Sequence, residues 1–271
     1  MGSGDFFSAN SGTLLAAVLA GAMTSLAVTG AAHASPWARA DGEFFIISRA
    51  DYFRADFGET DPGDFRRFES NTYVEYGLTE KVTLGGKAVY GTSWLTSAAG
   101  TETASGFTEI EGFGQYQFLR TAKHAASARI AVARPAAFQS GARANLQSDS
   151  VDTEAALLYG RNLVTGPMKI FAAAEAGYRR RFGGGADEFR TQTTIGIEPG
   201  RRWLILLDSF ATLSLRNEDP GGADYDVVKI QPSLVYRFSG RWTVQAGMTE
   251  EIAGRNLALG RTYFIGLWSA F

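Results

Sequence analysis

Long stretches of alternating apolar and polar side chains are the feature that most constrains this sequence. Residues 228–238 read VKIQPSLVYRF, with apolar or aromatic residues at the even positions and largely polar residues between them. Because successive side chains of a β-strand point to opposite faces, this pattern predicts a strand with one apolar and one polar face. Twelve segments of this type lie at 43–54, 66–78, 81–93, 106–119, 125–136, 149–160, 167–181, 187–198, 202–216, 225–238, 241–252 and 258–271.

The lengths of these segments and of their connections indicate a membrane barrel. Each segment has about 10 residues or more, enough for a tilted strand to cross a bilayer and about twice the usual strand of a soluble sheet. Short turns follow Leu78, Leu119, Gly160, Glu198 and Phe238, and longer links occupy 55–65, 94–105, 137–148, 182–186, 217–224 and 253–257. This alternation is typical of bacterial outer-membrane proteins. The sequence predicts an all-β fold, an antiparallel transmembrane β-barrel of about twelve strands with both ends on the short-turn side.

Aromatic residues gather at the ends of the segments. Beside the short turns lie Tyr76, Tyr116, Phe118, Tyr159, Trp203, Tyr236, Phe238 and Trp242. Near the longer links lie Tyr52, Tyr90, Trp94, Phe107, Tyr178 and Phe189. Amphipathic rings prefer the headgroup level of a bilayer, so two girdles are expected. The alternatives are aromatic packing in a soluble β core and a β-propeller, which the roughly 40-residue recurrence of tyrosine also fits.

The first 34 residues have the pattern of a targeting segment. An uncharged, mostly apolar run from Leu14 to Val28 precedes Ala32-His33-Ala34, and small residues at this spacing predict cleavage after Ala34. The preceding residues contain Asp5 and no Lys or Arg, which is atypical of a signal peptide, and a helical membrane anchor is the alternative. We therefore expect a signal peptide at 1–34 and a single barrel domain at 35–271, located in the bacterial outer membrane.

The polar faces of the segments carry ionised groups, which are costly in lipid; Arg or Lys at the bilayer midplane costs ~2–4 kcal/mol. They are therefore expected to face a closed interior. The residues predicted to line the lumen and the path of a solute are Glu75, Lys87, Glu109, Glu111, Arg129, Lys169, Glu175, Arg179, Arg181, Arg190, Asp208, Lys229 and Arg237. About 8 strands give a filled interior and roughly 16–18 a water-filled one, so a narrow path and a plug of Arg–Glu pairs both fit twelve strands.

Two details of this charge pattern lead to finer expectations. Arg179, Arg180 and Arg181 approach the longer-loop rim, and with Arg190 they would form a basic ring that draws anionic solutes inward. An outward Arg180 paired with lipid phosphate is the alternative for that residue. The acidic pairs Glu109/Glu111 and Asp152/Glu154 are expected to pair with Arg129 or Lys169 on neighbouring strands rather than to hold a cation.

Composition excludes several other classes of protein. The chain has 26 basic and 28 acidic residues, a balance that argues against a nucleic-acid partner. It has no cysteine, hence no disulfide framework and no cysteine-based metal site. His33 and His124 are the two histidines, and His124 lies in a short turn, away from the outer leaflet where barrel hydrolases act. A His-dependent nucleophile therefore lacks its base, and we expect neither an enzyme nor a cofactor.

The last eleven residues, RTYFIGLWSAF, resemble the C-terminal strand of bacterial outer-membrane barrels. Such strands end in Phe and carry apolar residues at alternate positions before it. Tyr263, Ile265, Leu267 and Phe271 match this pattern, whereas Ser269 departs from it. The resemblance implies that these residues act as the assembly signal read by the barrel-insertion machinery, a second expected partner beside outer-membrane lipid.

A hairpin near the N-terminus carries a second resemblance. The sequence YVEYGLTEKVTLGG at 73–86 looks like the "E-Y-G-L-T … L" hairpins of the MetA-pathway phenol-degradation family of outer-membrane proteins. The resemblance implies passive passage of small, often apolar or aromatic compounds. Three functions stay open: a channel or transporter for an unidentified small molecule, a plugged structural or anchoring barrel, and an outer-membrane enzyme.

Overall fold

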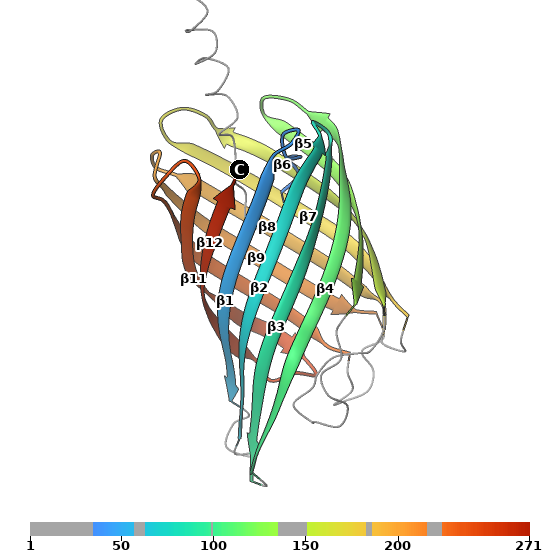
Figure 1. The fold of residues 1–271 in the computed structure, drawn as a ribbon. Helices are drawn as coiled ribbons and strands as arrows, with labels where there is room; N and C mark the ends of the chain where they lie inside the picture. The colour runs from blue at the N-terminus through green and yellow to red at the C-terminus, as the bar shows by residue number, and fades with distance from the viewer. Residues whose placement is uncertain (1–34, 57–62, 99, 135–150, 183–185, 216–223) are drawn as a thin grey trace, which may run out of the picture.

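The computed structural model describes residues 35–56, 63–98, 100–134, 151–182, 186–215 and 224–271. The predicted signal peptide at 1–34 lies outside the described residues. Twelve strands form the fold (Figure 1): β1 Phe44–Asp56, β2 Asp64–Thr79, β3 Val82–Ser97, β4 Gly100–Arg120, β5 His124–Arg134, β6 Asp152–Val164, β7 Lys169–Arg181, β8 Glu188–Glu198, β9 Trp203–Ser214, β10 Asp226–Arg237, β11 Trp242–Arg255 and β12 Gly260–Ala270. The described part contains no helix that is long and apolar enough to cross a membrane.

These strands close into one antiparallel barrel in sequence order, and β12 pairs with β1. The closing register runs from Phe45 opposite Ala270 to Ala55 opposite Gly260. An open sheet edge in lipid would leave backbone N–H and C=O groups without partners, and this seam removes both edges. The predicted fold class is confirmed, and the closed barrel excludes a propeller.

The alternation along each strand separates an outer from an inner face. In β10, Leu234 is exposed on the outside, whereas Ser233 and Val235 are buried inside. In β5, Ile130 and Val132 point outward and are 68% and 51% exposed, although both side chains are aliphatic. Water would penalise such exposure, whereas lipid does not, so the outer face forms an apolar belt suited to a bilayer.

Aromatic side chains lie at both ends of this belt, as the sequence predicts. At the short-turn rim, Tyr116, Phe118 and Trp203 are each at least 45% exposed. Toward the other rim, Tyr52 and Phe68 stand opposite each other on β1 and β2 and are 41% and 47% exposed. Rings at these levels can place their apolar bodies in lipid and their polar atoms at the headgroups.

One predicted loop is strand instead. The sequence predicts a link at 94–105, but β3 continues to Ser97 and β4 begins at Gly100, with Trp94 opposite Thr103. The hydroxyl oxygens of Thr96 and Thr101 lie 3.3 Å apart across this hairpin. The prediction was wrong because these polar residues, rich in β-branched threonine, favour a strand even without an apolar face.

The C-terminal strand has the orientation that its resemblance implies. Tyr263, Ile265 and Phe271 are exposed on the outer face, at 52%, 58% and 55%. Ser269, the residue that departs from the pattern, is buried at a register position between Ile46 and Trp242. Recognition of this strand by assembly machinery stays a prediction.

Candidate functional site: the barrel interior

The interior at the short-turn half is filled by apolar and aromatic side chains. They form one cluster that consists of Phe45, Ile47, Tyr73, Phe113, Ala131, Phe171, Leu204, Leu206, Val235 and Trp268. Tyr73 and Phe113 stack with ring centroids 5.8 Å apart, and Phe45 meets Trp268 edge to face. Inward-facing positions near the strand ends therefore build a core inside the barrel.

The segment that precedes β1 enters this half of the barrel. The side-chain amide of Gln115 donates to the Ser35 carbonyl at 3.0 Å, and that of Gln117 donates to the Pro36 carbonyl at 3.0 Å. The Ser127 hydroxyl donates to the same Pro36 carbonyl at 2.5 Å. These donors come from β4 and β5, so residues 35–43, called the N-terminal segment below, lie against the inner wall.

Aromatic and charged contacts hold the N-terminal segment further. Trp37 packs edge to face on Phe171, with ring centroids 6.4 Å apart. The Arg39 guanidinium is ion-paired with Glu75 and lies 3.9 Å from the centroid of the Phe45 ring. The buried Arg39 guanidinium thus contacts both a carboxylate and an aromatic ring inside the barrel.

Glycine makes the space for this segment. A Cβ atom at Gly160 would collide with the ring atoms of Pro36 and Trp37, and one at Gly77 would collide with the Ala40 carbonyl. The sequence did not reveal the segment as a plug, because a short stretch without periodicity carries no local signal. The signal that was present is the inward-facing Gly160, because a glycine inside a strand often marks a place where another part of the chain approaches closely.

Gly160 offers a direct test of this packing. We expect Gly160→Leu to push Trp37 from its seat and to speed chymotrypsin cleavage after Trp37 several-fold, measured by mass spectrometry of the digested protein. Ala174→Leu is the matched control, because Ala174 is exposed on the next strand on the opposite face. Equal cleavage of both variants and of the parent would contradict the packing of Trp37 against Gly160.

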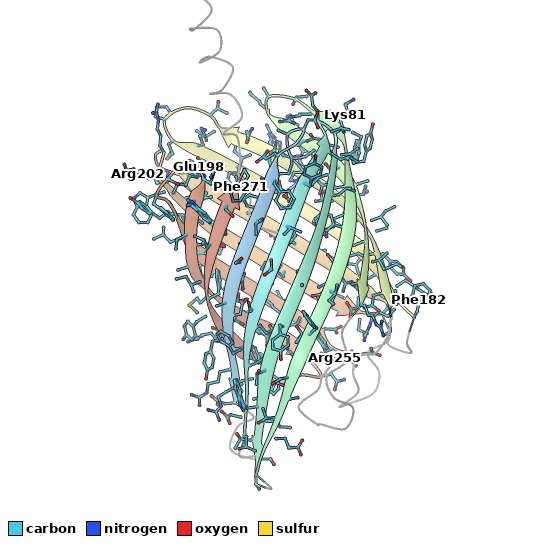
Figure 2. All side chains as sticks on the ribbon, viewed as in Figure 1. Lys81, Phe182, Glu198, Arg202, Arg255 and Phe271 are labelled. Carbon is cyan, nitrogen blue, oxygen red and sulfur yellow. The ribbon has the colours of Figure 1, made fainter. Side chains whose placement is uncertain are left out.

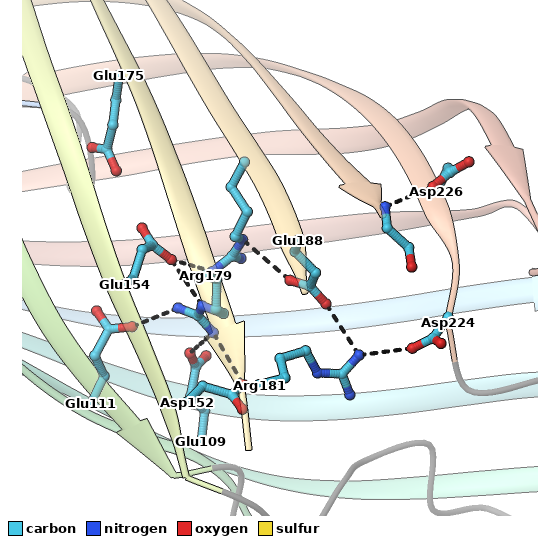
Figure 3. A network of polar contacts seen from close by, with 12 residues as sticks. Glu109, Glu111, Asp152, Glu154, Glu175, Arg179, Arg181, Glu188, Asp224 and Asp226 are labelled. Atoms are coloured by element: carbon cyan, nitrogen blue, oxygen red, sulfur yellow. Dashed lines mark hydrogen bonds and ion pairs between the residues drawn. The ribbon is translucent and has the colours of Figure 1, made fainter. Parts of the chain in front are cut away.

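The interior at the other half is dominated by ion pairs. Figure 3 shows Arg179 of β7 surrounded by four carboxylates from β4 and β6. Its nitrogens lie 2.8 Å from Glu154, 3.0 Å from Glu111, 3.7 Å from Glu109 and 4.0 Å from Asp152. Since Arg179 is 9% exposed, the network forms away from bulk water, where such pairs constrain side chains strongly.

Other pairs extend the network along the wall. Arg129 binds Glu175 and also Glu154, at 3.4 Å, and Lys87 binds Glu109 at 2.6 Å. The pairing of acidic residues with Arg129 is therefore confirmed for Glu154. Lys169, the other predicted partner, lies instead at the short-turn rim opposite Glu198.

A separate polar ladder lines the opposite side of the interior. Asp208 is fully buried and accepts hydrogen bonds from Thr194 at 2.6 Å and from Gln231 at 3.2 Å. Arg49 donates to Gln231 at 3.2 Å and lies 3.8 Å from the centroid of the Phe264 ring. Polar groups in the interior are thus largely satisfied by one another.

The predicted lumen residues are on the inner face. Those inside the barrel are Glu75, Lys87, Glu109, Glu111, Arg129, Glu175, Arg179, Arg190, Asp208 and Lys229. Arg237 joins Glu198 at the short-turn rim, and Arg181 joins Glu188 and Asp224 at the other rim. The arginines of the expected basic ring are all paired with carboxylates, and Arg180 points outward to Asp187 at 3.1 Å. Passage of a solute along these residues stays a prediction.

The described residues contain no group of three or more His, Asp or Glu side chains arranged to hold a metal ion. His124 binds the Tyr159 hydroxyl through Nδ1, at 2.7 Å, on the short-turn rim. The interior therefore has a polar, ionised half and an apolar half against which the N-terminal segment packs.

The closed wall, the apolar outer belt and the polar interior define a bacterial outer-membrane β-barrel. Neither a family model nor a characterised protein matches this sequence. Solved structures do match its fold. An outer-membrane channel from Pseudomonas putida F1 matches at 10% identity and a TM-score of 0.66, over 88% of this chain and 98% of the channel.

Two further structures share the architecture. The NanC porin matches at 8% identity and a TM-score of 0.53, over 82% of this chain and 98% of the porin. The translocator domain of the autotransporter NalP from Neisseria meningitidis matches at 11% identity and a TM-score of 0.52, over 95% of each chain. At these identities the likeness concerns the fold, and it confirms the predicted outer-membrane barrel class.

Proposed function

We propose that this protein is an outer-membrane channel for the passive passage of small molecules, closed at its short-turn end by the N-terminal segment. The observation that carries the proposal is the interior itself, where ionised side chains line one half and the N-terminal segment packs into the other. A twelve-strand wall encloses more space than the filled interior of an eight-strand barrel. That extra space is what the N-terminal segment occupies here.

Two features support a solute with an apolar body. The inward cluster around Phe113 and Phe171 would solvate an aromatic or aliphatic group. The hairpin at 73–86 resembles that of a family associated with phenol degradation. The polar half beyond it would accept a hydroxyl or a charged group of the same molecule.

Planar-bilayer recording tests the proposal. The refolded protein is expected to give small, steady conductance steps or brief openings, because the N-terminal segment is held by hydrogen bonds and one ion pair rather than covalently. A plugged anchoring barrel is the second candidate, favoured by the dense pairing around Arg179. A silent bilayer, for both the full barrel and a chain without the N-terminal segment, would select that second candidate.

A further inference from the structure

The basic residues without a carboxylate partner are concentrated at one rim of the barrel. In the lumen, arginines such as Arg179 form ion pairs. Outward arginines at the longer-loop rim are often paired as well, for example Arg54 with Asp56 at 3.0 Å. Arg134 and Arg255 are the exceptions there among the described residues. The exposed basic side chains at the short turns differ from the paired arginines in their lack of carboxylate partners among the described residues.

Every short turn contributes an exposed basic side chain that has no carboxylate within ion-pair distance among the described residues. Lys81 lies between β2 and β3, and Arg120 and Lys123 flank the turn between β4 and β5. Among the described residues, the exposed acidic side chains at the short-turn rim are those of Asp41 and Glu80.

The remaining turns repeat the arrangement. Arg161 lies beside the turn between β6 and β7, Arg201 and Arg202 precede β9, and Arg241 precedes β11. Figure 2 shows Lys81 and Arg202 at the end of the barrel that holds Phe271, away from Phe182 and Arg255. Because the five turns follow one another along a closed barrel, the positive charge extends around the rim from β2 to β11.

These cations stand at the level of the aromatic girdle. Arg202 donates to the Tyr236 hydroxyl at 3.3 Å, and the Arg241 guanidinium lies 4.9 Å from the centroid of the Phe271 ring. Aromatic side chains of this kind mark the headgroup layer of a bilayer. The guanidinium groups are therefore placed where lipid phosphates lie, and a guanidinium binds phosphate through paired N–H donors.

We propose that the short-turn rim is a binding site for the phosphate headgroups of anionic phospholipids in the leaflet that surrounds it. A compact solute or a single protein partner would contact one sector of the rim, whereas lipids contact the whole circumference. Charge complementarity and the shared level with the girdle both fit this occupant. The site is separate from the lumen, so it does not depend on the proposed channel.

Lipid selectivity at the protein surface tests the site. The full barrel is reconstituted in phosphatidylcholine vesicles with spin-labelled phosphatidylglycerol or, in parallel, spin-labelled phosphatidylcholine, and the motionally restricted fraction is measured by electron paramagnetic resonance. We expect a several-fold preference for phosphatidylglycerol that decreases as salt is raised. The variant Arg120→Gln/Arg161→Gln/Arg202→Gln/Arg241→Gln should lose most of that preference.

The matched control removes arginines from the other rim. Arg54→Gln/Arg66→Gln/Arg261→Gln neutralises three outward arginines that already have carboxylate partners, and it should keep the preference. The smaller change Arg202→Gln/Arg241→Gln serves if the fourfold variant does not refold. The proposal is overturned if the parent protein shows no preference for phosphatidylglycerol, or if both sets of variants lose that preference equally. A soluble acidic partner would then be the remaining occupant of the rim.

Discussion

A chain that begins at residue 41 is expected to conduct several times more current per channel than the chain that begins at residue 35. The shorter chain lacks Pro36, Trp37 and Arg39, which fill the short-turn half and bind Gln117, Phe171 and Glu75. Without them, water and ions would reach the ionised half of the lumen from both rims. Single-channel recording of the two refolded proteins under one salt gradient makes the comparison.

The control for this experiment separates opening from damage. The shorter barrel should keep its heat-resistant compact migration on detergent gels, because the N-terminal segment contributes no strand to the wall. Equal conductance of the two chains would show that the N-terminal segment does not limit passage. If the shorter chain no longer refolds, the N-terminal segment is part of the core that stabilises the barrel. The conductance of the Gly160→Leu variant would then provide the test of opening.

Arg179→Ala is the second change with a large expected effect. It removes the cation that four carboxylates share, at a position that is 9% exposed. Breaking a buried pair from one side costs about 3–5 kcal/mol, because the remaining charge keeps its desolvation penalty. We expect a loss of that order in the free energy of unfolding, measured by urea titration in lipid vesicles, and a shift of ion selectivity toward cations.

Two comparisons sharpen this result. Arg54→Ala removes an exposed pair, 58% and 65% exposed on its two sides, and should change the free energy of unfolding by about 0–1 kcal/mol. Glu111 has Arg179 as its ion-pair partner, so Arg179→Ala/Glu111→Gln should lose less than the sum of the single changes. Strict additivity of the two single changes in the free energy of unfolding would contradict the shared network. An unchanged reversal potential in the Arg179→Ala variant would contradict it as well.

Local sequence predicted the wall of the barrel well. Alternation is a property of adjacent residues, so the inward orientation of Glu75, Lys87 and Glu175 followed from their neighbours alone. The twelve strands and their pairing with chain neighbours followed from the same pattern and from short turns.

The contents of the barrel could not be predicted in the same way. Arg179 on β7 reaches Glu111 on β4, and that contact depends on strand register and on the curvature of the closed wall. The N-terminal segment is held by Gln115 and Gln117, which lie 80 and 81 residues from the atoms they bind. Neither relation leaves a periodic trace in the sequence.

The hairpin of β3 and β4 extends beyond the lipid. With 21 residues, β4 has a contour of about 70 Å at a rise of ~3.3 Å per residue. Tilted by about 40°, it rises about 50 Å, whereas the hydrocarbon core is about 30 Å thick. Figure 1 shows this hairpin reaching past the other strands at the longer-loop end. The alternation of short turns and longer loops predicts that this end faces the outside of the cell, so the exposed Thr101 and Thr103 are suitable places for a surface label.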